Sequence, residues 1–437
     1  MIMNDRGTIA TLAAAVLLRL AVAASVYGYA VDMNLFKAWA AHAFAGGLRH
    51  FYDGTLFVDY PPGYIYVLYL AGGLRFLFGF GYESAAYALL VKLPAIAADA
   101  VIGLLFFKWG QASLAPEPAD AAGAPPRKDA GSAGRAAGLT SDAGSAAGLA
   151  AAALYWFHPA AIVDSAAWGQ VDAVFMLPVL IAMTLLVRGK PPQAAAAFAA
   201  ALLIKPQALL FGPLLLAAVI RERSWKTFLG CALWGLPVLI LPALPFTIDK
   251  PGGPLWLAEL YFGTLSQYPY ASLNAYNLHA LLGGNWQSVE RSVLGLTHTA
   301  WSFIGLAAGV AYSVLLYLRS KSASVLYFLG FFLIAALFMT MVKMHERYLM
   351  YAFPMLLLSW VHTKDRRVLM LFLGFGATAF VNVYDVLTRS FSQVIHIDRH
   401  DGLLMLVSLA NTALLVWAAK VGWDLYGGGG SAARSAS

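Results

Sequence analysis

The chain has 437 residues, of which 60% are hydrophobic and 12% charged, and its net charge is +7. Soluble domains carry about 25% charged residues, so this composition excludes a soluble globular protein. It predicts an all-α polytopic membrane protein. Positive charge is typical of the cytoplasmic loops of such proteins and does not require a nucleic-acid partner. The lone cysteine, Cys231, excludes an intrachain disulfide.

Apolar blocks that approach or reach the length of a membrane helix recur along the whole chain. They predict a bundle of about 11–13 transmembrane helices. The first block follows Arg6 and lacks a convincing signal-peptidase site, so we expect it to be retained as a helix. The clear blocks are 8–28, 84–107, 146–164, 172–188, 192–221, 226–246, 299–318, 324–342, 346–361, 366–386 and 402–420, and 62–80 is ambiguous.

Basic clusters between the blocks indicate the orientation, because Lys and Arg are enriched in cytoplasmic loops. All clusters share that side if 62–80 does not fully cross and 192–221 is two short helices broken near Lys205-Pro206. We therefore expect a plasma-membrane protein with a cytoplasmic N-terminus. The polar segments expected outside are 29–61, 168–172, 247–298, 344–347 and 387–401.

Composition divides the chain into four parts. Residues 1–108 hold the first helix, an outer loop with amphipathic helices and a second helix. Residues 109–149 are rich in Ala, Gly, Ser and Pro and are predicted to be a disordered cytoplasmic linker. Residues 150–425 form the main transmembrane bundle, and residues 426–437 a disordered tail.

The first outer loop begins with Asp32, which precedes apolar residues at helical spacing (Leu35, Phe36, Trp39, Ala40, Phe44). The spacing predicts an amphipathic helix at the membrane surface. Asp32 stands where a helix N-cap belongs, so a capping role is one interpretation. The other is a carboxylate at the mouth of a membrane cavity, which acts as a general base or substrate anchor.

Two further polar groups lie on the same predicted face. Asp59 and Tyr60 precede a double proline, which fits a structural turn or a place in the site. Trp168, Gln170 and Asp172 form a polar island between two apolar helices. An interfacial Trp is ordinary, but the amide and carboxylate are costly at this depth and suit sugar recognition.

A cluster of charge lies at the junction of two apolar blocks, in the sequence MVKMHERYL, with Lys343, His345, Glu346 and Arg347. Such residues can snorkel to the membrane surface, but four of them with both signs favour a phosphate-binding site. Lys205 is a second candidate phosphate ligand, again with snorkelling as its alternative.

The long outer loop offers weaker candidates. Asn274, Tyr276 and Asn277 suit a carbohydrate-facing surface or an ordinary polar loop equally well. The sequence HIDRH at 396–400 is a weak metal signal, and loop solvation explains it better. We assign no metal ligands and predict no cofactor.

These motifs together resemble the GT-C superfamily of membrane glycosyltransferases, and most closely the bacterial mannosyltransferases related to glycosylphosphatidylinositol mannosyltransferase II. The segments that carry the resemblance are DMNLFKAWA, VDYPPGYIY, KLPAIAADAV, WGQVDAVF, KPQALLF and MHERYL. The resemblance implies a polyprenyl-phosphate sugar donor, reaction on the outer face and inversion at the anomeric carbon. It implies that Asp32 is the catalytic base and that the His345–Arg347 turn lies near the donor phosphate.

The resulting hypothesis is an inverting transferase for a hexose, with mannose implied by the resemblance. Asp32 would take the acceptor proton, while Lys205, His345 and Arg347 would stabilise the departing phosphate. The substrate-binding residues would be Asp59, Tyr60, Trp168, Gln170, Asp172, Asn274, Tyr276, Asn277 and Glu346. Its partners would be the lipid-linked donor, membrane lipid and an acceptor of unassigned class. A lipid flippase or transporter, and a glycan polymerase or ligase, remain as alternatives.

Overall fold

The computed structural model describes residues 6–113, 130–250, 253–266 and 268–428. It confirms the all-α class, because the strands of the described residues are short pairs in loops. The helices are α1 (Arg6–Ser25), α2 (Ala30–Gly46), η2 (Leu48–His50), α3 (Pro62–Leu77), α4 (Ala85–Ala112), α5 (Ala130–Trp156), α6 (Pro159–Ile162), η4 (Val163–Trp168), α7 (Asp172–Val187), α8 (Pro191–Ile204), η5 (Pro206–Phe211), α9 (Gly212–Arg221), α10 (Trp225–Ile240), η6 (Leu241–Phe246), η7 (Gly253–Leu255), α11 (Trp256–Ser266), α12 (Leu278–Leu281), α13 (His298–Arg319), α14 (Val325–Thr340), η8 (Tyr348–Tyr351), α15 (Ala352–Thr363), α16 (Arg366–Phe391) and α17 (Gly402–Tyr426).

The four strands tie loops together. Strands β1 (Ser272–Leu273) and β4 (Met344–His345) pair in parallel, and β2 (Ser292–Val293) pairs antiparallel with β3 (Leu296–Thr297). The β1–β4 pair fastens the long loop before α13 to the charged turn after α14. Two loops that are far apart in the sequence are thereby held side by side.

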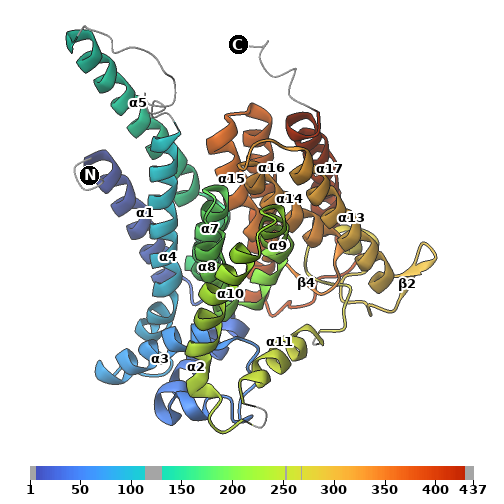
Figure 1. Cartoon of the computed structure of the whole chain (residues 1–437). Helices are drawn as coiled ribbons and strands as arrows, with labels where there is room; N and C mark the ends of the chain where they lie inside the picture. The colour runs from blue at the N-terminus through green and yellow to red at the C-terminus, as the bar shows by residue number, and fades with distance from the viewer. Residues whose placement is uncertain (1–5, 114–129, 251–252, 267, 429–437) are drawn as a thin grey trace.

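The long helices form a bundle with α2, α3 and α11 at one end (Figure 1). Helices α1, α4 and α5 lie on one flank, α13 and α17 on the other, and α7 to α10 between them. Helix α14 lies in the core, since residues 325–339 are all buried. Its side chains are almost all apolar, and such a helix can be buried on every side.

Fewer helices have full spanning length than the predicted 11–13. Among the described residues, six are long and apolar enough to cross a membrane, or seven if the bent pair 143–156 and 159–168 counts as one. Four apolar helices are shorter, and two of these, 191–204 and 206–221, are the short pair predicted for block 192–221. The other two, α7 and α14, have 16 residues each. Sixteen residues extend about 24 Å, less than the roughly 30 Å hydrocarbon core. Such helices end beside the loops that build the site.

The two topological conditions inferred from the basic clusters fit the structure. Segment 62–80 contains α3, which has 16 residues, packs along α2 and is not among the helices that could span. Block 192–221 is broken as predicted, because Lys205 is extended (φ −152°, ψ 131°) between α8 and η5. A proline follows Lys205 and cannot donate the backbone bond that would continue the helix.

Basic residues from separate helices gather at one end of the bundle. Arg221 donates to the carbonyls of Tyr317 and Ser320 at 3.0 and 3.2 Å, at the end of α13. Arg319 lies 4.8 Å from the ring of Trp423 in α17. Near that end of α17, Asp424 pairs with Arg367 and Lys420 (3.1 and 2.8 Å). The residues of these four clusters therefore lie together at one end of the bundle.

In the interval 109–149, where the sequence predicts a disordered linker, the described residues 109–112 and 130–149 are helical. Helix α4 continues to Ala112, and α5 begins at Ala130. A side chain on Gly148 would place its Cβ 2.5 Å from the carbonyl oxygen of Phe107, so the two helices touch through glycine. Small residues at this spacing permit close helix packing in membranes, and composition alone does not reveal it. Residues 114–129, and tail residues 429–437, lie outside the described residues.

Candidate functional site

A large cavity of about 730 Å³ lies where α2, the start of α7, the α8–η5 break and the β4 turn converge. Its polar wall contains the carboxylates of Asp32, Asp59 and Glu346 and the cations Lys205 and Arg347. Its apolar wall includes Leu209, Leu210, Phe303 and Met341. The cavity therefore unites most of the residues selected from the sequence, across more than 300 positions of chain.

Asp32 lies in the first turn of α2, but it does not cap the helix. The cap position is Tyr29, and no side chain caps there. Instead the Oδ2 atom of Asp32 accepts hydrogen bonds from Trp168 Nε1 (2.7 Å) and Gln170 Nε2 (2.6 Å). The capping interpretation is therefore wrong, since the carboxylate is bound to the opposite wall of the cavity.

Backbone geometry fixes Asp32 relative to Trp168. The amide of Tyr29 donates to the carbonyl of Trp168 at 3.1 Å, and the two rings stack with centroids 4.5 Å apart. Gly28 (φ +116°) makes this approach possible, because a Cβ there would lie 2.5 Å from the same carbonyl oxygen. Buried Lys92 donates to the carbonyls of Val26 (2.6 Å) and Ala166 (3.0 Å), which joins the segments before Asp32 and Trp168.

The Trp168–Asp172 island follows a single π-turn, η4, a conformation that is frequent at functional sites. The turn ends at Gly169 in the left-handed region. Gln170 is buried and accepts from the Tyr60 hydroxyl at 3.4 Å while its amide donates to Asp32. The two loops that precede α3 and α7 are thus connected through one amide.

Arg347 is the central cation of the site and is 8% exposed. It pairs with Glu346, and its Nη1 lies 3.6 Å from Asp32 Oδ2 and its Nε 4.0 Å from Asp172 Oδ2. Its guanidinium lies 4.9 Å from the centre of the Trp168 ring. A guanidinium shared by acids rather than locked to one of them can still bind an anion bidentately.

Lys205 is held by Asp172 instead of reaching the membrane surface. The two side chains are each 3% exposed and form a hydrogen-bonded ion pair. Asp172 also accepts from the Tyr351 hydroxyl at 3.3 Å. Snorkelling does not explain Lys205, and its positive charge is largely balanced before any ligand arrives.

Burial changes the protonation of three groups in the loops of the site. It raises the pKa of Asp59 to about 6 and that of Glu346 to about 7. It lowers the pKa of His345 to about 3, with Arg347 acting in the same direction. His345 is therefore neutral at pH 7 and can offer a hydrogen bond, but not a positive charge.

The outer-loop candidates lie in different surroundings. Asn274 borders the cavity, but its side chain joins Trp286, Asn285 and the Ile395 carbonyl. The Tyr276 hydroxyl donates to Asp385, and Asn277 caps α12 and donates to the Phe338 carbonyl. Neither Tyr276 nor Asn277 is among the residues that line the cavity.

Other lining residues were not selected from the sequence. Gln207 donates to the Tyr348 hydroxyl at 2.8 Å, and Tyr29 and Tyr268 add aromatic faces. Gln207 and Tyr348 stand inside the KPQALLF and MHERYL segments, which was the available signal. In the HIDRH loop, the ring of His396 packs against the ring of Trp286, with the ring centres 3.9 Å apart. No cluster of three or more potential metal ligands occurs in the part of the chain described by the structure.

Comparison with protein families matches residues 57–343, more than half of the chain, to the model of glycosyltransferase family 87. The chain belongs to glycosyltransferase family 87. A search of curated proteins finds no match. The matched residues of this glycosyltransferase exclude Asp32 and Arg347, so their place in the site comes from the geometry.

Proposed function

We propose that this glycosyltransferase is an inverting enzyme that transfers a hexose, specifically mannose, from a polyprenyl-phosphate donor to an acceptor hydroxyl outside the plasma membrane. The observation that carries the proposal is the position of Asp32 in a large cavity, oriented by two hydrogen bonds and 3.6 Å from Arg347. A base beside a cation is what acceptor deprotonation and phosphate departure together require.

The reaction follows from this arrangement. Both hydrogen bonds and the Arg347 contact involve Oδ2 of Asp32, so Oδ1 is the oxygen offered to the acceptor hydroxyl. As Asp32 takes the proton, the acceptor oxygen forms a bond to the anomeric carbon and the bond from that carbon to the phosphate oxygen breaks. The polyprenyl phosphate leaves with the bonding electron pair, and attack from the opposite face inverts the anomeric carbon.

Each remaining cationic or polar group has a role in this proposal. Arg347 stabilises the charge that develops on the phosphate, with His345 as a neutral hydrogen-bond donor. Lys205 contributes as a dipole with Asp172 more than as a free charge. Asp59, Tyr60, Glu346 and Asn274 border the space available to the sugar and acceptor.

The apolar wall of the cavity supports a lipid-linked donor. Leu209 in η5 and Phe303 in α13 both line the cavity, yet they are 46% and 65% exposed. Large apolar side chains that are exposed at a cavity wall suit a prenyl chain. A sugar nucleotide would leave this wall without a matching ligand surface.

The test uses purified enzyme in nanodiscs and radiolabelled mannose on polyprenyl phosphate. Asp32→Asn is expected to lower kcat about 10²–10⁴-fold and to leave donor binding within a few-fold, because general-base help is lost. Asp53→Asn, an exposed carboxamide change in the same outer loop, is the matched control. Near-normal turnover of Asp32→Asn would refute the assignment. Donor binding without transfer by the wild-type protein would favour a transporter.

A further inference from the structure

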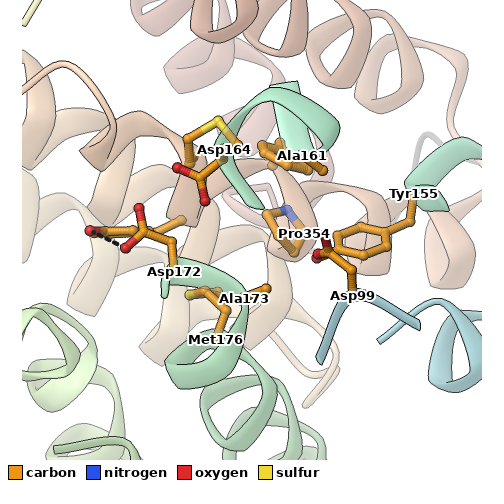
Figure 2. Close-up of a pocket in the computed structure, with 11 residues that line it drawn as sticks. Asp99, Tyr155, Ala161, Asp164, Asp172, Ala173, Met176 and Pro354 are labelled. Atoms are coloured by element: carbon orange, nitrogen blue, oxygen red, sulfur yellow. Dashed lines mark hydrogen bonds between the residues drawn. The ribbon is translucent and has the colours of Figure 1, made fainter. Parts of the chain in front are cut away.

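A second, much smaller cavity lies behind the site, deeper in the bundle. Its volume is about 20 Å³, the space of a single water molecule. Figure 2 shows the carboxylates of Asp164 and Asp172 close together at one part of this pocket and Asp99 beside Tyr155 at another. Three carboxyl groups therefore surround one water-sized space.

Two of these carboxylates have compensating partners. Asp99 pairs with Arg19 at 3.0 Å and accepts from Tyr155 (2.7 Å) and Ser165 (2.6 Å). Asp172 pairs with Lys205 through Oδ1. Both can be ionised at this depth because an opposite charge and hydrogen bonds replace the lost hydration.

Asp164 differs from both. It is 3% exposed, it has no ion pair among the described residues, and its Oδ1 atom has no hydrogen-bond partner there. An ionised carboxylate buried without a partner is far more costly than the neutral acid. The arrangement of charges therefore favours a proton on Asp164.

The facing oxygen of Asp172 completes the pattern. Its Oδ2 is also buried without a hydrogen bond, and Arg347 Nε lies 4.0 Å from it. A water in this space can donate to both of these buried acceptors. The oxygen of that water can then accept a hydrogen bond from the acid proton of Asp164, so that every polar group of the set has a partner.

We propose that Asp164 is a neutral carboxylic acid which, through one water bound in this cavity, positions Asp172 and with it Lys205. The backbone of Asp164 serves the other half of the site, because its carbonyl accepts from the amides of Gly169 (3.1 Å) and Gln170 (3.0 Å). Asp164 thus contacts two parts of the site: Gln170, which donates to Asp32, and, through the water, Asp172, which pairs with Lys205. Its effect on turnover rests on the proposed transferase function, whereas its protonation does not.

Asp164→Asn and Asp164→Leu separate this role from simple filling of space. Asn is shaped like the neutral acid and can donate to the same water, so it should keep kcat and donor KM within about threefold of wild type. Leu keeps the volume but supplies neither donor nor acceptor, and should lower kcat at least about tenfold while KM changes less. The pH profile of kcat should be unchanged in Asp164→Asn, because a neutral group is replaced by a neutral group.

Infrared difference spectroscopy on exchange into deuterium oxide tests the proton directly. At pH 9, where Asp59 and Glu346 are ionised because their pKa values are about 6 and about 7, we expect a protonated-carboxyl C=O band that is absent in Asp164→Asn and retained in Asp99→Asn, the matched change at a paired carboxylate. The proposal is overturned if that band is missing from the wild type, survives in Asp164→Asn, or if Asn costs as much kcat as Leu. If the wild type transfers no sugar, the transferase proposal fails, and the infrared band still decides whether Asp164 carries a proton.

Discussion

The Lys205–Asp172 ion pair offers a sharp test of how the site is held together. Both side chains are 3% exposed, so removal of one partner leaves a buried charge uncompensated. Breaking such pairs costs about 3–5 kcal/mol. Lys205→Met should fall at the low end of that range, because Arg347 lies 4.0 Å from Asp172 and compensates in part.

Asp172→Asn should fall at the high end. Lys205 would lose its ion pair and keep a neutral amide oxygen and the aromatic faces of Tyr60, Phe175 and Tyr351, at 5.7, 5.8 and 5.8 Å. A desolvated cation–π contact is worth about 2 kcal/mol, less than the ion pair that is lost. The double variant removes both charges and should recover much of the loss, with a coupling energy above about 1 kcal/mol.

The assay is thermal unfolding in detergent, followed by fluorescence size-exclusion chromatography, with sugar transfer measured on the same samples. The exposed pair Arg49–Asp249 is the matched control, and Asp249→Asn should change the unfolding temperature little, because water already solvates both groups. The reasoning is refuted if Asp172→Asn unfolds at the same temperature as Asp249→Asn, or if the double variant is less stable than both singles.

Three other measurements test separate features. Burial raises the pKa of Glu346 to about 7, so between about pH 4.5 and 7 the native state binds more protons than the unfolded state. Stability therefore falls as pH rises through this range. Glu346→Gln should flatten this dependence, which is measured as the unfolding temperature against pH. Trp168→Phe deletes one donor to Asp32 and should lower kcat about tenfold while donor binding, measured by isothermal titration, stays constant. Gly148→Ala drives a Cβ into α4 and should reduce the folded yield, whereas Gly46→Ala, which meets nothing within 4 Å, should not.

The fold class and the grouping of polar residues could be predicted from the sequence, because both follow from strong composition signals. Hydropathy identifies apolar helices, and charges cost too much in lipid to be scattered without reason. The break at Lys205 could also be predicted, since Pro206 follows it.

Other features depend on contacts that no local pattern encodes. Asp32 looked like a helix cap, and only the approach of Trp168 and Gln170 from 136 and 138 positions away gives its carboxylate other donors. The sequence allowed Tyr276 to be a carbohydrate ligand, but in the structure its hydroxyl donates a hydrogen bond to Asp385. The Gly148 contact of α5 could not be predicted from its low-complexity segment, because it depends on the facing helix α4.

The carbonyl contacts of Lys92 have a consequence for how the protein is assembled. Its ammonium can be satisfied early by the carbonyls of Ala23 and Val26, because these residues and α4 all belong to the first part of the chain to be made. The carbonyl of Ala166 joins only when the chain has been inserted as far as η4. Asp32 therefore lacks its Trp168 and Gln170 donors until some 130 further residues have been synthesised. It lacks Arg347 for longer still. When the chain is inserted in order, the carbonyl contacts of Lys92 form first and Arg347 reaches Asp32 last.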